Sequence, residues 1–158
     1  MSMVQNLISN KWQPGKAAVD GLAATVAYSV AMEGDMILAK NAFSDVRFIE
    51  GMIAGTKSTP VTRTLAWVLH MLNGVALAEV YAATFKRWLP GPDWLKGSLF
   101  AELFVVGVWG LTPLADKYHP LIKDGQLPKL FTWKSFFQNL IRHFVFGLVL
   151  GLLYRGKK

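Results

Sequence analysis

The fold of this chain is indicated by two segments that share one pattern, residues 70–81 (HMLNGVALAEVY) and residues 143–154 (HFVFGLVLGLLY). In each, glycine, leucine and tyrosine follow a histidine by 4, 7 and 11 positions, and the segments begin 73 positions apart. Because an α-helix turns about 100° per residue, the four residues of each segment share one face. Both segments are apolar, so the pattern predicts a membrane protein of two related halves, each with a helix that carries a histidine-led stripe.

The composition favours a membrane protein over a soluble one. Of 158 residues, 53% are hydrophobic and only 17% charged, whereas about 25% are charged in a typical soluble domain. The net charge of +7 arises mainly at the ends of apolar runs, as in membrane proteins, so no nucleic-acid partner is expected. The absence of cysteine excludes disulfides, iron–sulfur clusters and covalently attached c-type haem. The first apolar run contains Glu33 and Asp35, which predicts a retained helix rather than a signal peptide.

Four apolar runs predict helices that cross a bilayer. Spanning the hydrocarbon core takes about 20 residues, a length that the runs between Arg63 and Lys86 and between Lys96 and Asp116 reach. Tryptophans lie at or near the ends of the runs, with Trp109 further in, and indole prefers the membrane interface. We therefore predict one all-α membrane domain over residues 1–158, a four-helix bundle of two helix-hairpin halves with spans over residues 18–40, 63–86, 96–115 and 134–154.

The connections between the runs add further expectations. Pro90-Gly91-Pro92 predicts a short, stiff turn that makes the second and third helices adjacent and antiparallel. Residues 43–54 predict either a short amphipathic helix in the membrane interface or a loop with apolar anchors. Basic residues divide evenly between the two sides of the membrane, and the clusters at 86–87 and 155–158 favour cytoplasmic termini in a bacterial inner membrane.

Four polar residues are predicted to lie at one depth in the membrane, Glu33, His70, Arg142 and His143, because each lies seven to nine residues from the same side. In one interpretation Arg142 pairs with Glu33 or Asp35, and the histidines bond to neighbouring helices. In another, His70 and His143 ligate a haem or chlorin from its two faces. A proton or ion pathway is a third. A metal site is not expected, since no His/Glu pair has the usual helical spacing.

A second polar layer is predicted nearer the opposite surface, where Glu79 and Glu102 lie six or seven residues from Lys86 and Lys96. If the two carboxylates met, they could not both stay charged in a low dielectric, and one would hold a proton. Alternatively, each reaches the headgroup region or bonds to a nearby polar side chain.

The C-terminal segment 143–154, followed by basic residues, and a first helix that opens near Gly21 and carries Glu33 late resemble small bacterial inner-membrane proteins of the YagU-like type. The resemblance covers about two of the four helices. It implies a fold and a location, and it brings no catalytic residues.

The function predicted first is that of a non-enzymatic accessory or scaffold subunit, whose partners are the lipid bilayer and other membrane proteins. No motif of hydrolase, transferase or nucleotide chemistry occurs in the chain, and no residue is predicted to be catalytic. Two alternatives remain open. One is a haem- or chlorin-binding electron- or energy-transfer protein that uses His70 and His143. The other is a small transporter or proton conductor that uses the histidines with Glu33, Glu79 and Glu102.

Overall fold

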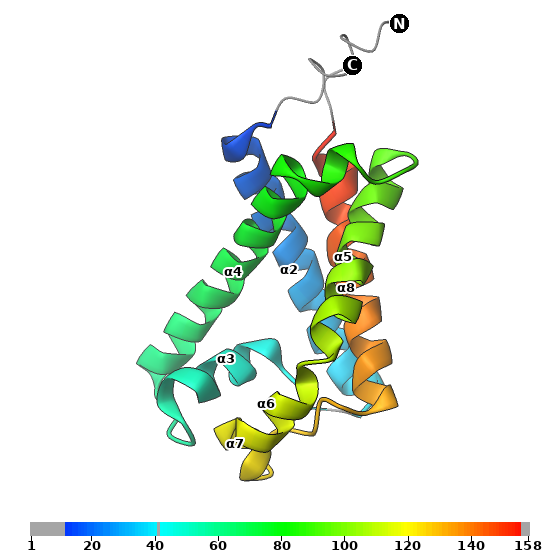
Figure 1. The fold of residues 1–158 in the computed structure, drawn as a ribbon. Coiled ribbons are helices and arrows are strands. Elements are labelled where there is room, and N and C mark those ends of the chain that lie inside the picture. Colours follow the sequence, from blue (N-terminus) through cyan, green and yellow to red (C-terminus); the bar gives the residue numbers. More distant parts are fainter. Residues whose placement is uncertain (1–11, 41, 156–158) are drawn as a thin grey trace, which may run out of the picture.

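The computed structural model describes residues 12–40 and 42–155, and its regular elements are all helices (Figure 1), which confirms the predicted all-α class. The basic cluster predicted at the C-terminus lies outside these residues beyond Arg155. Four long helices form the body of the molecule, α2 (Pro14–Leu38), α4 (Pro60–Ala83), α5 (Asp93–Trp109) and α8 (Trp133–Leu153). Four shorter ones connect them, α3 (Asp45–Ala54), η1 (Phe85–Arg87), α6 (Thr112–Tyr118) and α7 (Pro120–Lys123).

Local caps decide where the helices begin. The Thr59 side chain accepts a hydrogen bond from the Thr62 amide at 3.1 Å, and Pro60 occupies the first turn of α4. Thr132 caps α8 in the same way through the amide of Ser135, also at 3.1 Å. Helices α4 and α5 begin at residues 60 and 93, three residues before the predicted starts at 63 and 96. The predicted starts were placed at the charged residues that flank the apolar runs, whereas the helices extend beyond those residues.

Helix α2 lies between α4 and α8, and α5 packs along α8, so the two predicted hairpin pairs are both present (Figure 1). The second and third helices run antiparallel as predicted, but they meet only near the turn that joins them, where the ring centroids of Tyr81 and Phe100 lie 5.4 Å apart. After Ala83 the short helix η1 intervenes, and α4 packs against α2 and α3 rather than along α5. Helix α3 extends from α4 toward α7 across the lower end of the molecule (Figure 1).

The glycines of the two stripes are points of close helix approach. A β-carbon on Gly74 would lie 1.7 Å from Oγ1 of Thr25 on α2, and one on Gly147 would lie 2.3 Å from the carbonyl oxygen of Gly97 on α5. At the far end of the stripes, the rings of Tyr81 and Tyr154 lie edge to face with centroids 6.4 Å apart. The repeated pattern thus marks the same packing device in both hairpins.

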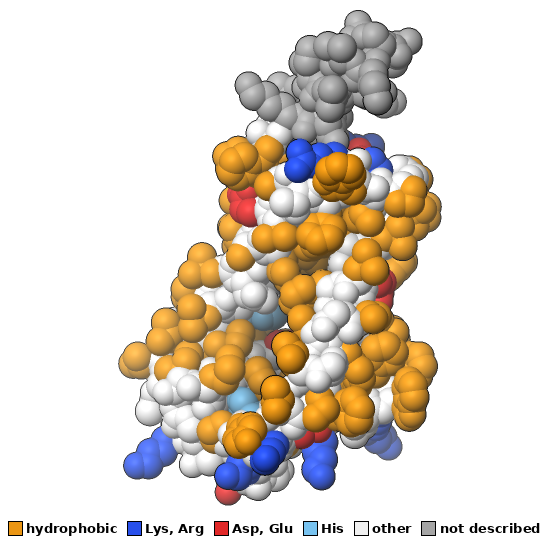
Figure 2. Space-filling view, viewed as in Figure 1, with side chains coloured by type: hydrophobic (Ala, Val, Ile, Leu, Met, Phe, Trp, Pro, Cys, Tyr) orange, Lys and Arg blue, Asp and Glu red, His pale blue; other side chains and the backbone are white. Residues whose placement is uncertain are grey.

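Two helices, α4 and α8, are long and apolar enough to cross a membrane. A third span exists if α5 and α6, bent by 52° at their junction, are one broken helix. Helix α2 has the length but is less apolar, since it carries Glu33 and Asp35 in its last turns. On the face shown in Figure 2, Lys and Arg gather at the two ends, and hydrophobic side chains cover much of the surface between them. These features indicate a membrane protein with two or three spanning helices.

Of the two structures predicted for residues 43–54, the helix is correct, and α3 begins after Ser44, whose side chain accepts from the Arg47 amide. Its buried side holds Glu50, which accepts hydrogen bonds from Ser58 at 2.6 Å and from Nε of Arg63 at 2.9 Å. These bonds fasten α3 to the start of α4. Burial alone would raise the pKa of Glu50, but the bonds from Ser58, Arg63 and Thr62 outweigh it and hold the pKa below its usual value.

Candidate functional site

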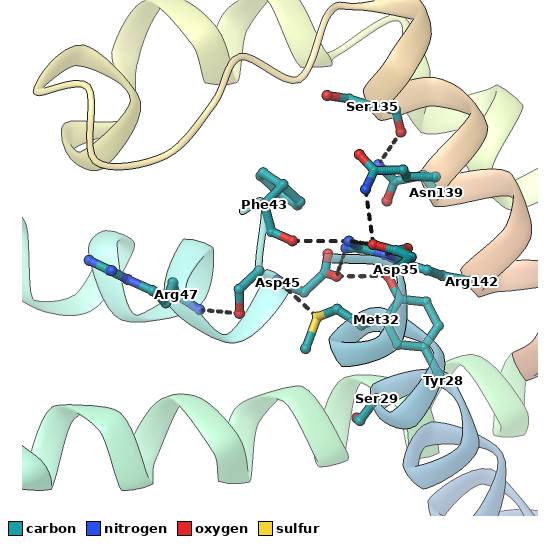
Figure 3. A network of polar contacts seen from close by, with 12 residues as sticks. Tyr28, Ser29, Met32, Asp35, Phe43, Asp45, Arg47, Ser135, Asn139 and Arg142 are labelled. Carbon is teal, nitrogen blue, oxygen red and sulfur yellow. Dashed lines mark hydrogen bonds and ion pairs between the residues drawn. The ribbon is translucent and has the colours of Figure 1, made fainter. Parts of the chain in front are cut away.

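A buried arginine joins helices α2, α3 and α8. Arg142 of α8 has no exposed surface. Its guanidinium donates hydrogen bonds from Nε and Nη2 to the two carboxylate oxygens of Asp35 on α2 (Figure 3). Its Nη1 lies 3.3 Å from Oδ2 of Asp45 on α3, and Nη2 also donates to the Phe43 carbonyl at 3.1 Å. This bidentate geometry is the strong form of an arginine–carboxylate pair. The cluster therefore fixes α2, α3 and α8 relative to one another.

The cluster contains more negative than positive charge. Two carboxylates, Asp35 and Asp45, share the single guanidinium of Arg142. Neutral donors assist them: the Tyr28 hydroxyl donates to Asp45 at 2.8 Å, and the Gln138 amide donates to Asp35 at 2.9 Å. One negative charge is thus left without a cation, and Asp45, whose side chain is 26% exposed, is the more open of the two acids.

The structure brings three residues of the predicted first layer together and leaves one out. His70 and His143 both contact the Tyr28 ring, whose hydroxyl reaches the Arg142 cluster, at 5.7 and 4.9 Å between ring centroids. Glu33 is exposed and lines a separate hollow. The reason is helical geometry, since residues two apart point to opposite sides of a helix, and Asp35 is the one that faces α8.

Sequence reasoning missed Tyr28 and Asp45. Tyr28 lies seven residues before Asp35, a spacing that places both on one face of α2 and was available as a signal. Asp45 is the first residue of α3, directly after the capping Ser44, where an acidic residue has an ordinary structural explanation. No local signal distinguished it from a helix-cap residue.

The hydrogen bonds of the two histidines assign their tautomers. Ser29 donates its only hydroxyl proton to the Thr25 carbonyl at 2.8 Å, so Nε2 of His70, 3.0 Å from Ser29 Oγ, carries the proton of that contact. Nδ1 of His143 lies 2.9 Å from the Asn139 carbonyl, which can only accept. In their neutral forms the remaining nitrogens, Nδ1 of His70 and Nε2 of His143, are therefore unprotonated acceptors.

A pocket of about 400 Å³ opens beside this cluster, between α2, α3, α4 and α8. Figure 2 shows the molecule hollowed on the face between α4 and α8. The pocket combines one polar region with apolar walls. Its polar lining comprises Thr25, Tyr28, Asp45, His70, Asn73 and His143, and its apolar lining includes Phe48, Ile49, Met52, Leu69, Leu77 and Phe146.

The pocket does not present the two histidines to a flat ring between them. Each keeps one unprotonated nitrogen, as ligating histidines do, but the Tyr28 ring packs against both, and the bond to Asp45 holds that ring in place. A haem or chlorin ligated by His70 and His143 would require Tyr28 to move, so that hypothesis stays a prediction. Among residues 12–40 and 42–155, no group of three or more metal-ligating side chains is present.

The two glutamates of the predicted second layer are held apart. Glu79 on α4 accepts a hydrogen bond from the Trp12 indole at 2.8 Å. Glu102 is on α5, which does not pack along α4, and its buried Oε1 has no hydrogen-bond partner within the described part of the chain. The arrangement favours separate environments over a shared proton.

Comparison with protein-family models, with curated proteins and with solved structures returned no match to this chain. The YagU-like resemblance therefore stays a prediction, and the site is interpreted from its own geometry.

Proposed function

We propose that this protein is a non-enzymatic membrane protein that binds a small amphiphilic molecule taken up sideways from the bilayer. The observation that carries this proposal is the 400 Å³ pocket, which joins apolar walls to a polar end lined by Tyr28, Asp45 and both histidines. Ligand pockets in proteins span about 300 to 1,000 Å³ and combine mostly apolar walls with a few placed polar groups. In the proposed membrane layout, α2, α4, α8 and the α5–α6 pair cross the bilayer.

Asn73 supports an occupant for the pocket. It lies in the middle of α4, is exposed, and its side chain makes no hydrogen bond within the described residues. An amide left unpaired in hydrocarbon costs several kcal/mol, on the order of the loss for any unsatisfied polar group there. Since Asn73 lines the pocket, a bound molecule or a water held with it would satisfy the amide.

Access from the side follows from the packing of α4. Most of its contacts are with α2, α3 and η1, and Tyr81 near its end also meets Phe100 of α5, with ring centroids 5.4 Å apart. Beside the pocket, the surface is hollowed on the face between α4 and α8 (Figure 2). Two salt bridges hold the helices around this opening in place. Glu50 and Arg63 connect α3 to α4, and Asp35 and Arg142 connect α2 to α8. A pocket between braced helices is preorganised for a ligand.

The test is to fill the pocket and look for the loss of a bound molecule. The protein is purified gently from its native membrane, and the small molecules that remain are quantified by mass spectrometry. Leu69→Trp places bulk in the pocket, and Val68→Trp is the matched control, because Val68 is the next residue of α4, is 48% exposed and lies outside the lining.

We expect one small molecule to be retained per protein in the wild type and in Val68→Trp. We expect Leu69→Trp to lose it. A wild-type protein without any retained molecule, or equal retention by both variants, would overturn the proposal. The visible spectrum of the same sample tests the haem and chlorin alternative, which requires an absorption band that disappears in His143→Ala.

Glu102 favours the accessory-subunit function as a second candidate. A carboxylate with an unpaired buried oxygen in an apolar helix is costly, and a donor from a neighbouring membrane protein would satisfy it. A stoichiometric protein partner that co-purifies in mild detergent with wild type and Leu103→Ala, but not with Glu102→Leu, supports this function. Identical partners for all three proteins argue against Glu102 as the contact. The bacterial inner membrane and cytoplasmic termini remain part of this proposal.

A further inference from the structure

We infer that the molecule bound in the pocket carries a protonated amine, a deduction that rests on the proposed function. The argument compares the hydrogen-bond donors and acceptors that the pocket offers, and then its charge.

The residues that line the pocket offer several hydrogen-bond acceptors that no group in the described part of the chain uses. The assigned tautomers leave Nδ1 of His70 and Nε2 of His143 without protons, and no hydrogen bond from the described residues reaches either nitrogen. Within the described residues, Asp45 receives its side-chain hydrogen bonds from Tyr28 and Arg142 on Oδ2, and none reaches Oδ1. The three residues that carry these acceptors belong to three different helices, and all three line the pocket.

Most hydrogen-bond donors around the pocket already donate to protein groups. The Tyr28 hydroxyl donates to Asp45, and the Thr25 hydroxyl donates to the Gly21 carbonyl at 2.7 Å. The proton on His70 is directed at Ser29 and the one on His143 at Asn139. Among the polar side chains that line the pocket, Asn73 alone has an N–H that no described residue accepts. A ligand that only accepts hydrogen bonds, such as a quinone, an ester or a carboxylate, would leave most of the polar lining unpaired.

The charge around the pocket favours a cation. Arg142 is bound bidentately by Asp35, so Asp45, the acid that lines the pocket, lacks a full counter-charge. The rings of Tyr28, Phe48 and Phe146 form part of the wall, and aromatic faces attract ammonium groups. An ammonium has three donors and no acceptor, which matches a lining of acceptors. A metal ion is less suitable, because no set of three ligating side chains occurs in the described residues.

The test compares three molecules with the same twelve-carbon chain: dodecylamine, dodecanol and dodecanoate. Binding to the purified full-length protein in nanodiscs is measured by calorimetry at neutral pH. The Leu69→Trp protein in identical nanodiscs serves as the blank for partition into lipid. A charge-assisted hydrogen bond is worth roughly 1.5 to 3 kcal/mol, so we expect the amine to bind about 10- to 100-fold more tightly than the alcohol, and the carboxylate more weakly than both.

A variant of Asp45 tests whether this carboxylate causes the tighter binding of the amine. Asp45→Asn keeps the shape and removes the charge, and it should weaken amine binding about tenfold while alcohol binding stays unchanged. If that variant does not fold, the wild-type comparison of the three molecules still decides. Equal binding of all three, or tightest binding of the carboxylate, would overturn the amine inference and leave the proposed function in place. Binding no stronger than to Leu69→Trp for every molecule would overturn both.

Discussion

Removal of the Arg142 side chain should destabilise the protein more than any other single change to a charged residue. In Arg142→Met, the side-chain volume is largely kept, but Asp35 and Asp45 lose their common cation while remaining only 16% and 26% exposed. Breaking a buried ion pair by removing one partner costs about 3 to 5 kcal/mol, because the other charge stays buried without compensation. Here two carboxylates are left together, so we expect the upper part of that range.

The free energy of unfolding is measured in mixed detergent micelles by titration with sodium dodecyl sulfate, with tryptophan fluorescence as the signal. Lys134→Met, at an exposed position at the start of the same helix, is the control and should change stability by less than about 0.5 kcal/mol. Arg142→Lys keeps the charge but loses the bidentate fork and should fall between the two. A loss below about 1 kcal/mol for Arg142→Met would refute the reasoning that this cluster fixes the three helices.

Two further changes have defined outcomes. Gly147→Ala should cost about 1 to 3 kcal/mol in the same assay, because the new β-carbon would meet the Gly97 carbonyl on α5, whereas Gly107→Ala, with open space around it, should be neutral or stabilising. The lowered pKa of Glu50 means that its bonds stabilise the protein above the usual glutamate pKa and that this contribution is lost as the pH falls through the folded-state pKa. Acidification should therefore destabilise the wild type more than Glu50→Gln, measured as melting temperature against pH, and parallel curves would contradict this assignment.

The repeated stripe contributes to helix packing in both halves through its glycine. Its first residue, the histidine, lines the pocket in both halves. Gly74 and Gly147 admit a neighbouring helix, and these neighbours are α2 in one hairpin and α5 in the other. The histidines that lead the stripes lie against the same tyrosine of α2 and line the same pocket. A pattern that first indicates related halves therefore also marks two walls of one site.

The helical elements were largely predictable from the sequence. Apolar runs flanked by charges and by Pro or Gly predict long helices over most of the residues that α2, α4, α5 and α8 occupy, since each helix must satisfy its own backbone within an apolar environment. Gly147 and Gly151, four residues apart in an apolar helix, likewise predict a close helix contact, because residues at this spacing share one face and leave room for a neighbouring helix. The bend after Trp109, where α5 gives way to α6, was not predictable from hydropathy, which is continuous across it.

What depended on the tertiary structure was which polar groups meet. An arginine in an apolar helix implies a carboxylate partner inside the protein, but Glu33 and Asp35 were equal candidates for Arg142 until the rotation of α2 against α8 was known. Asp45 joins the cluster only because the chain turns back after α2 and places α3 beside α8. Helix α4 packs mainly against α2 and α3 although a short turn connects it to α5. Helix formation is governed by contacts within a few residues, whereas the pocket and its charge depend on contacts between residues far apart in the chain, such as Asp35 and Arg142, which are 107 positions apart.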